Sequence, residues 1–252
     1  ITMINQSIFR AYDIRGIYPD ELNEKKAYEI GRAFAIYLKE EQNEQLEKIV
    51  IGHDARVSSP ILKRALIEGA ISEGMNIWDI GLATVDMVYF ASGYFHLPAV
   101  MITASHNSND WNGFKLMKSD VNFFSVKDLE AIINEERKTS QERGEVTMED
   151  IKSDYINHVL GVVDTDKIRS MRIAIDIKSD AVGRVFKSIF EKLPLEISAE
   201  HYHFGCAFDS DGDRVSCTDE KGSTINPSII RALFAKYFLK KTFSSFVSIS
   251  KI

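Results

Sequence analysis

The sequence predicts an α/β fold made of two successive α/β domains, each with a mixed, largely parallel sheet sandwiched between helices. Two observations lead to this prediction. Short β-branched runs alternate with segments of helical apolar spacing, and a dense run of charged residues interrupts the alternation near the middle of the chain. With 252 residues, 44% of them hydrophobic, the chain is long enough to bury two modest cores.

The first half alternates helices and strands. Apolar residues recur at helical spacing, and Ser125 is a candidate N-terminal cap for the last helix. The helices are predicted over 25–41, 60–73, 86–94 and 125–138. The short runs between them are typical of strands, and they are KIVIGHD, NIWDIG, AVMITAS and FKLM. Because strands separated by helices tend to pair in parallel, this half is expected to form a largely parallel sheet.

The charged run over residues 135–154 marks the expected boundary, and a helix over 150–162 is expected to bridge the two halves. The predicted domains are 1–150, 151–241 and, as a stub of a third domain, 242–252.

The second half begins with a new α/β unit. Its predicted elements are the strand MRIAID, a helix over 181–192, the strands GCAFD and RVSCTDEKG on either side of a tight acidic turn, a helix over 229–239 and a last strand, FSSFVSISKI. Pro227 stands where the first turn of a helix tolerates proline.

Composition narrows the classes of protein. The formal net charge of −6 argues against a nucleic-acid partner, since nucleic-acid binders usually carry a basic face. No stretch approaches the roughly 18 to 20 apolar residues of a membrane span, so no membrane partner and a cytoplasmic location are expected. Cys206 and Cys217 lack a CxxC spacing and are interpreted as reduced core residues. The sequence does not indicate an oligomeric state.

The acidic turn FDSDGDRV predicts a metal site. Asp209, Asp211 and Asp213 alternate in a turn between strands, where their charges repel one another unless a hard cation such as Mg²⁺ offsets the repulsion. An EF-hand loop is excluded because Arg214 occupies the position that needs glycine. A polar hairpin without an ion remains the alternative. Arg214 is interpreted either as a clamp for a phosphate or as an ion-pair partner of the aspartates.

The segment MITASHNSNDWNGFKLM predicts a phosphate site at the end of a strand. A serine-hydrolase triad is disfavoured because Ser105 and His106 are adjacent and no GxSxG elbow is present. A phosphorylated Ser105 suits the segment better, with Asn107, His106 and backbone N–H groups as donors and Lys115 as a proton-transfer or charge partner. A simple helix cap at Ser105 remains open.

Two further clusters combine arginine with aspartate. FRAYDIRG contains Arg10, Asp13, Arg15 and Gly16, and GHDARVSS contains Asp54, Arg56, Ser58 and Ser59. Either cluster can bind phosphate or form a structural ion pair, and for Arg56 the structural interpretation is favoured.

In their order, FRAYDIRG, GHDARVSS, TASHN with NGFK, and FDSDGDRV resemble the motifs of the α-D-phosphohexomutase family, of the bacterial phosphomannomutase/phosphoglucomutase type. The resemblance spans residues 9 to about 220 and implies phosphoglucomutase-like domains 1 and 2. It also implies an enzyme that interconverts hexose 1-phosphate and hexose 6-phosphate, of mannose, glucose or both. The reaction that the resemblance implies proceeds through a phosphoserine and a bound hexose 1,6-bisphosphate, which is also the implied activator.

The resemblance assigns a role to individual residues. Ser105 is the implied phosphoserine, and the implied metal ligands are Ser105, Asp209, Asp211 and Asp213, with one Mg²⁺ per chain. The implied catalytic residues are Ser105, Lys115, Arg15 and His106. The implied binders of the phosphosugar are Arg15, Asn107, Lys115 and Arg214.

The chain departs from the family pattern at several points. Ser108 replaces a proline, GLATVDM lacks a threonine-proline pair, Ser179 and Asp180 replace an asparagine-glycine turn, and the connection from Leu195 to Phe208 is short. The sequence also stops where the family's third domain begins. An incomplete chain of an active enzyme is the favoured interpretation, with the chain alone expected to be slow or inactive. The alternative is a truncated, non-catalytic relative that binds Mg²⁺ and phosphosugar.

Overall fold

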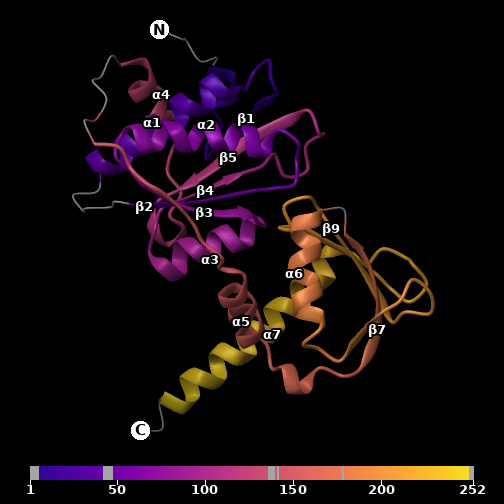
Figure 1. Ribbon diagram of the computed structural model, residues 1–252. Helices are drawn as coiled ribbons and strands as arrows, with labels where there is room; N and C mark the ends of the chain where they lie inside the picture. Colours follow the sequence, from indigo (N-terminus) through magenta and orange to yellow (C-terminus); the bar gives the residue numbers. More distant parts are fainter. Residues whose placement is uncertain (1–5, 42–47, 136–139, 141, 178, 250–252) are drawn as a thin grey trace.

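The computed structural model describes residues 6–41, 48–135, 140, 142–177 and 179–249, and its helices and strands form two α/β units (Figure 1). The strands of the first unit lie within residues 13–148, and those of the second within residues 171–218. The predicted α/β class with mixed, largely parallel sheets is confirmed.

The first sheet has six strands in the order β1-β5-β4-β2-β3-β6. Its strands are β1 (Asp13–Ile17), β2 (Lys48–His53), β3 (Asn76–Leu82), β4 (Ala99–Ile102), β5 (Trp111–Met117) and β6 (Val146–Met148). The β2, β3, β4 and β6 pairings are parallel, whereas β5 runs antiparallel to both β4 and β1. The β4–β5 connection therefore reverses the direction of the chain at the carboxyl end of β4, and it carries the Ser105 segment.

Helices cover both faces of this sheet. The helices are α1 (Glu24–Glu41), α2 (Ser59–Ser72), α3 (Val85–Phe95) and α4 (Lys127–Asn134), with the short 3₁₀ turns η1 (Gln6–Ile8) and η2 (Ser119–Val121). Ile49 and Ile51 of β2 belong to a core with α1, α2 and α4, while Val50 between them belongs to a core with α3. This alternation is what a strand buried on both faces requires.

The second sheet has four strands in the order β10-β9-β7-β8. The elements of this half are α5 (Lys152–Val162), η3 (Thr165–Lys167), β7 (Met171–Ile177), α6 (Asp180–Phe190), β8 (Leu195–Ile197), β9 (Phe204–Phe208), β10 (Val215–Thr218) and α7 (Pro227–Ile249). The β7 pairings with β8 and β9 are parallel, whereas β9 and β10 form an antiparallel hairpin. The acidic turn is the tip of that hairpin.

Helix α5 links the two units, as the sequence predicts. The ring of Tyr155 on α5 lies 5.7 Å from that of Phe90 on α3, and Lys192, just beyond α6, donates to Asn157 of α5 (3.4 Å). Figure 1 shows α5 between α3 and α6. In the described part of the chain, no helix is both long and apolar enough to cross a membrane.

Three local predictions are wrong. The segment FSSFVSISKI is not a strand, because α7 continues through it to Ile249, and residues 250–252 lie outside the described residues. Ser125 does not cap α4: the N-cap is Val126, and Ser125 contributes only its backbone carbonyl. Residues 136–139 of the predicted helix also lie outside the described residues. Cys206 and Cys217 are free, as predicted, but half-buried instead of fully buried in the core.

Candidate active site and metal centre

Ser105 lies just beyond the carboxyl end of β4, in the turn that leads to β5. Its side chain is almost completely buried, and its backbone has φ +53°, a left-handed conformation that non-glycine residues adopt rarely and mostly where function or tight packing requires it. The Ser105 N–H donates to Thr103 Oγ1 (2.8 Å), which helps to hold this turn. The backbone at Ser105 is thereby held in this turn.

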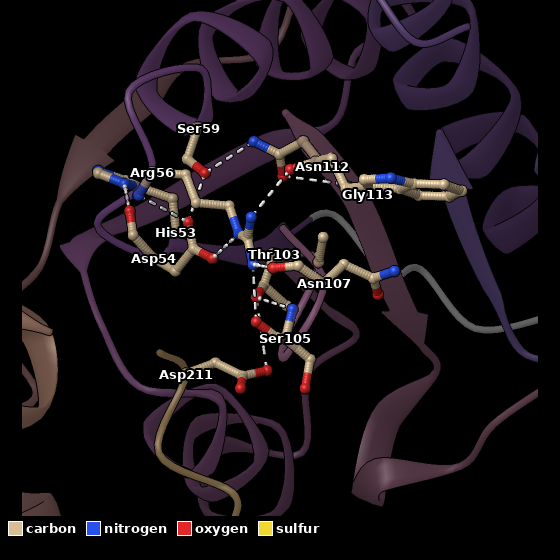
Figure 2. A network of polar contacts seen from close by, with 12 residues as sticks. His53, Asp54, Arg56, Ser59, Thr103, Ser105, Asn107, Asn112, Gly113 and Asp211 are labelled. Carbon is tan, nitrogen blue, oxygen red and sulfur yellow. Dashed lines mark hydrogen bonds and ion pairs between the residues drawn. The ribbon is translucent and has the colours of Figure 1, made fainter. Parts of the chain in front are cut away.

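Arg56, between β2 and α2, anchors this turn to the rest of the first unit. Its guanidinium donates to four backbone carbonyls, those of Ser105, Asn107, Ser108 and Trp111, at 2.6–3.1 Å. Its Nε pairs with Asp54 Oδ2 (3.1 Å), and Asp54 is fully buried. Figure 2 shows Arg56 at the centre of this polar network. The structural interpretation of Arg56 is confirmed, because its donors are directed at the protein itself.

Arg15 reaches the same turn from β1. Its guanidinium donates to Asn107 Oδ1 (2.7 Å) and to Asp13 Oδ2 (2.8 Å). Strand β1 approaches β5 closely at Gly113, where an added Cβ would lie 2.2 Å from the carbonyl oxygen of Ile14. Glycine at this position therefore lets β1 bring Arg15 beside the Ser105 turn.

The three aspartates of the acidic turn converge, as the sequence predicts. One carboxylate oxygen from each of Asp209, Asp211 and Asp213 lies within 4.8 Å of the others. The turn has φ +82° at Gly212, and Asp209 Oδ1 accepts the N–H groups of Gly212 and Arg214, both at 3.1 Å. These bonds fold the turn so that its carboxylates face one point.

The acidic turn meets the first unit at four places. Ser105 Oγ lies 3.5 Å from Asp209 Oδ2, and Lys115 Nζ lies 3.0 Å from a carboxylate oxygen of both Asp211 and Asp213. Thr103 Oγ1 lies 3.4 Å from Asp211 Oδ2, and the Val85 N–H donates to the Asp211 backbone carbonyl (3.0 Å). The site is thus assembled from both units.

The pKa values follow from this crowding of charge. Burial and the Asp211 carboxylate raise the pKa of Asp209 to about 6. Burial would lower the pKa of Lys115, but the nearby acidic groups, Asp211 first, outweigh it and raise that pKa. Burial likewise opposes ionisation of Asp213, yet the Lys115 ammonium lowers its pKa. Lys115 therefore carries a positive charge and partly neutralises the carboxylates.

The residues present fit a hard divalent cation. Asp211 is fully buried, and its Oδ1 has no hydrogen-bond partner among the described residues. An unsatisfied buried carboxylate oxygen is costly, and a metal ion would satisfy it. Oxygen ligands from three carboxylates match the preference of Mg²⁺, which usually completes its octahedron with water or phosphate oxygens. Asp209, Asp211 and Asp213 are the residues that would hold the ion.

Comparison with known proteins agrees with this geometry. Residues 6–143, more than half of the chain, match the family described as "Phosphoglucomutase/phosphomannomutase, alpha/beta/alpha domain I". The chain belongs to the phosphoglucomutase/phosphomannomutase family. It is 30% identical over 275 residues to a phosphomannomutase of Vibrio cholerae, covering 92% of this chain and 59% of that protein. It is 31% identical over 278 residues to phosphohexose mutases of Xanthomonas campestris, with coverages of 92% and 59%.

Solved structures of the family show the same architecture. A phosphoglucomutase/phosphomannomutase family protein from Burkholderia thailandensis superposes with a TM-score of 0.86 at 26% identity, covering 95% of this chain and 60% of that one. A Paramecium phosphoglucomutase, pp63/parafusin, gives a TM-score of 0.65 at 14% identity over 90% of this chain and 55% of that one, which is a likeness of fold alone. The chain thus spans about three fifths of the length of the curated relatives it matches.

The structure of this family member gathers most of the residues predicted for the site. Ser105, Lys115, Asp209, Asp211 and Asp213 meet through direct contacts, and Arg15 and Asn107 join them through the Ser105 turn. A helix cap at Ser105 is not observed, since residues 105–110 form a turn that leads directly into β5. His106 Nδ1 lies 3.4 Å from Ser105 Oγ, and the His106 side chain is exposed.

Arg214 lies at the edge of the site. Its Nε is 3.9 Å from Asp213 Oδ1, and 59% of its side chain is exposed. Arg10 is exposed, and its N–H donates to the Asp13 carbonyl.

Sequence reasoning missed two contacts. GLATVDM stood out only as a departure from the family pattern, yet Thr84 caps α3 and the Val85 N–H bonds to Asp211. Thr103, at the start of the predicted polar segment, bonds to both the Ser105 N–H and Asp211. The Val85 contact uses a backbone group, which residue type does not reveal; a polar threonine at a strand end was the one available signal for Thr103.

Proposed function

We propose that this chain provides the phosphoserine and the metal centre of a phosphohexomutase, which interconverts hexose 1-phosphate and hexose 6-phosphate of mannose, glucose or both. The observation that carries the proposal is the 3.5 Å approach of Ser105 Oγ to Asp209 Oδ2, because it joins a buried hydroxyl of one unit to the acidic cluster of the other. Membership of the family and its relatives named phosphomannomutase support the same reaction.

The proposed step transfers a phosphoryl group from Ser105 to the sugar. A free hydroxyl of the hexose monophosphate bonds to phosphorus, the bond from phosphorus to Ser105 Oγ breaks, and the proton of the sugar hydroxyl is lost as Ser105 Oγ gains one. The product is a hexose 1,6-bisphosphate. After this product reorients, its other phosphate returns to Ser105 by the reverse step, which leaves the isomerised monophosphate and a phosphorylated serine.

Phosphoryl transfer depends mainly on positioning and charge neutralisation, and each residue of the site has a matching role. Asp209, Asp211, Asp213 and an oxygen on Ser105 would hold Mg²⁺, which would supply positive charge to the phosphoryl oxygens. Lys115 holds a proton on Nζ inside the site and is the proposed general acid and base. Arg15 orients the turn through Asn107 and adds a positive charge beside it.

The remaining assignments concern the rim of the site. Arg214 is exposed and only loosely paired, so its guanidinium is free to clamp the phosphate of an incoming phosphosugar. His106 is the proposed donor to the phosphate oxygens on Ser105, since its ring already lies against the hydroxyl. The sugar hydroxyls have no assigned partner, so mannose and glucose remain joint candidates.

The experiment starts from the chain, Mg²⁺ and glucose 1,6-bisphosphate. Peptide mass spectrometry is expected to find one phosphate on Ser105, absent from Ser105→Ala and present in the matched control Ser108→Ala, whose serine lies in the same turn. Mannose 1-phosphate and glucose 1-phosphate are then supplied and the 6-phosphates measured. Phosphorylation with turnover supports the mutase and rules out a non-catalytic relative that binds Mg²⁺ and phosphosugar. Phosphorylation without turnover is expected both of an incomplete chain of an active enzyme and of that relative, and the same assay on a full-length version separates them, because only the mutase then yields 6-phosphate. An unphosphorylated Ser105 would contradict the mutase.

A further inference from the structure

A pair of thiols lies at the base of the hairpin that carries the acidic turn. Cys206 on β9 and Cys217 on β10 are direct partners in the antiparallel register, and their sulfur atoms are 3.8 Å apart. Between them the chain runs through all three aspartates. No feature of phosphoryl transfer requires these thiols, so their pairing calls for a separate explanation.

The backbone geometry at this pair suits a disulfide. The Asp209 N–H donates to the Arg214 carbonyl (3.3 Å), which makes that opposed pair a hydrogen-bonded one. Hydrogen-bonded and non-hydrogen-bonded pairs alternate along an antiparallel ladder, so Cys206 and Cys217, three positions further along, form a non-hydrogen-bonded pair. The Cα atoms of such pairs lie about 4.5 Å apart, within the range of about 4.4–6.8 Å that a disulfide spans. The sulfurs, now 3.8 Å apart, would have to approach to about 2.05 Å for the bond to form.

The surroundings of the two thiols set the order of events. Phe208, two residues after Cys206 and therefore on the same face of β9, packs its ring 4.2 Å from that of Phe186 on α6. The Cys206 thiol thus lies on the face that α6 covers, and this burial, followed by the effect of Cys217, raises the pKa of Cys206 to about 12. Cys217, its partner on β10, lies on the same face and is likewise half-buried, and the Ile225 N–H bonds to its carbonyl from the outer side of the strand (2.9 Å). Since the thiolate is the reactive form, the raised pKa of Cys206 makes Cys217 the thiol expected to react first.

We propose that Cys206 and Cys217 are a redox modification site, which a low-molecular-weight disulfide such as oxidised glutathione converts to an intramolecular disulfide. The Cys217 thiolate attacks one sulfur of the reagent and releases one thiol, which leaves a mixed disulfide on Cys217. The Cys206 sulfur then attacks the Cys217 sulfur, and the second thiol departs. Two protein thiols lose two hydrogens, and one disulfide of the reagent is reduced to two thiols.

The crosslink acts on the acidic turn. By joining β9 to β10 it removes conformations in which the base of the hairpin opens, so the three carboxylates are held in place before a cation binds. Pre-ordering a site lowers the entropic cost of binding. Oxidation is therefore expected to tighten Mg²⁺ binding. This consequence rests on the metal site proposed above, whereas formation of the disulfide does not.

The first arm of the test measures the disulfide alone. The folded 252-residue chain is incubated with excess oxidised glutathione, blocked with iodoacetamide and analysed by intact and peptide mass spectrometry. The expected product is lighter than the reduced chain by two hydrogens, resists alkylation and yields a peptide joined through Cys206 and Cys217. Cys206→Ser is expected to stop at a glutathione adduct on Cys217. Both thiols remaining open to alkylation, or each carrying its own adduct, would overturn the proposal.

The second arm measures Mg²⁺ binding by calorimetry in the reduced and oxidised chains. Binding is expected to tighten roughly threefold on oxidation and to be unaffected by the same treatment in a Cys206→Ser/Cys217→Ser double variant. Equal affinity in the reduced and oxidised chains would overturn the coupling to the acidic turn. Absence of Mg²⁺ binding in both forms, with the disulfide formed, would contradict the proposed metal site and leave the thiol pair supported.

Discussion

The two loops that meet at the site are held in opposite ways. The Ser105 turn is fixed by a buried guanidinium that bonds four carbonyls and a buried carboxylate. The acidic turn is fixed by two backbone bonds to Asp209 and by Lys115, which comes from the other unit. The first loop is thus complete within its own unit, whereas the second keeps unneutralised charge. The difference indicates that the fold alone holds the Ser105 turn, whereas the acidic turn is the place where we propose that a cation binds.

Replacing Arg56 is expected to have the largest effect on stability, because it removes the side chain that holds the Ser105 turn. Arg56→Met leaves Asp54 buried without its charge partner and is expected to cost about 3–5 kcal/mol in the free energy of unfolding. Urea denaturation measures the loss. The control is Arg143→Met, whose ion pair with Glu68 is at least half exposed and is expected to be worth less than about 1 kcal/mol. Equal losses of unfolding free energy in the two variants would mean that Arg56 holds the Ser105 turn no more strongly than a surface ion pair would.

Removing a ligand from the acidic turn tests its dependence on a cation. At a Mg²⁺ concentration one hundred times the dissociation constant, the unmodified chain is expected to gain about 2.7 kcal/mol of stability. Asp211→Asn should lose nearly all of that gain, because the buried carboxylate is the ligand with an unsatisfied oxygen. Thermal unfolding with and without Mg²⁺ measures it. Glu220→Gln, the same charge change at an exposed acid, should keep the gain, and a full gain in Asp211→Asn would refute the metal assignment.

Lys115 is the cationic side chain that contacts the acidic turn, so its removal should affect stability differently without Mg²⁺ and with Mg²⁺. Without Mg²⁺, Lys115→Met is expected to cost about 1–3 kcal/mol, since it takes away the partner of buried Asp211. With Mg²⁺ present, the gain in stability should exceed that of the unmodified chain, because no ammonium competes for the carboxylates.

Chemical denaturation at several Mg²⁺ concentrations tests this prediction. The matched control is Lys63→Met, which removes the similarly buried partner of Asp79 and should leave the Mg²⁺ gain unchanged. A smaller Mg²⁺ gain in Lys115→Met than in the unmodified chain would mean that Lys115 does not stand in for the cation.

The smallest effect is expected at the backbone of the acidic turn. Gly212→Ala should cost about 1 kcal/mol, because φ is +82° and the new Cβ would lie 3.1 Å from Val182. The control is Gly161→Ala in α5, where a Cβ meets nothing within 4 Å and alanine is expected to stabilise by up to about 1 kcal/mol. Differential scanning calorimetry compares them, and a stabilised Gly212→Ala would show that the turn does not need glycine.

Sequence reasoning succeeded where a local pattern determines the structure. The apolar spacing of residues 25–41 and 60–73 placed α1 and α2 to within one residue at each end. It failed at FSSFVSISKI, where β-branched and aromatic residues favour a strand but no glycine or proline separates them from the preceding helix, so α7 continues. β6 was missed because it has only three residues, all of them exposed, inside the charged run interpreted as a boundary.

For the candidate site, too, prediction from sequence succeeded only where a local pattern of residues was enough. The acidic turn and the Ser105 segment were recognisable because side-chain type carries their chemistry. The contacts that join the two segments were not recognisable from the sequence. The pairing register of the strands, the left-handed backbone conformation of Ser105 and the hydrogen bond of the Val85 N–H are properties of the folded backbone. The network of Arg56 was foreseen only as an ion pair with Asp54, because carbonyl acceptors are present at every residue and leave no mark in the sequence.

The most direct test is a crystal structure of the chain treated with glucose 1,6-bisphosphate and grown with Mn²⁺, whose anomalous signal locates the ion. The predicted result is a single peak in the acidic turn, within about 2.5 Å of one oxygen from each of the three aspartates and of an oxygen of a phosphate on Ser105. A peak elsewhere, or an unmodified Ser105 with no cation beside it, would contradict the shared site.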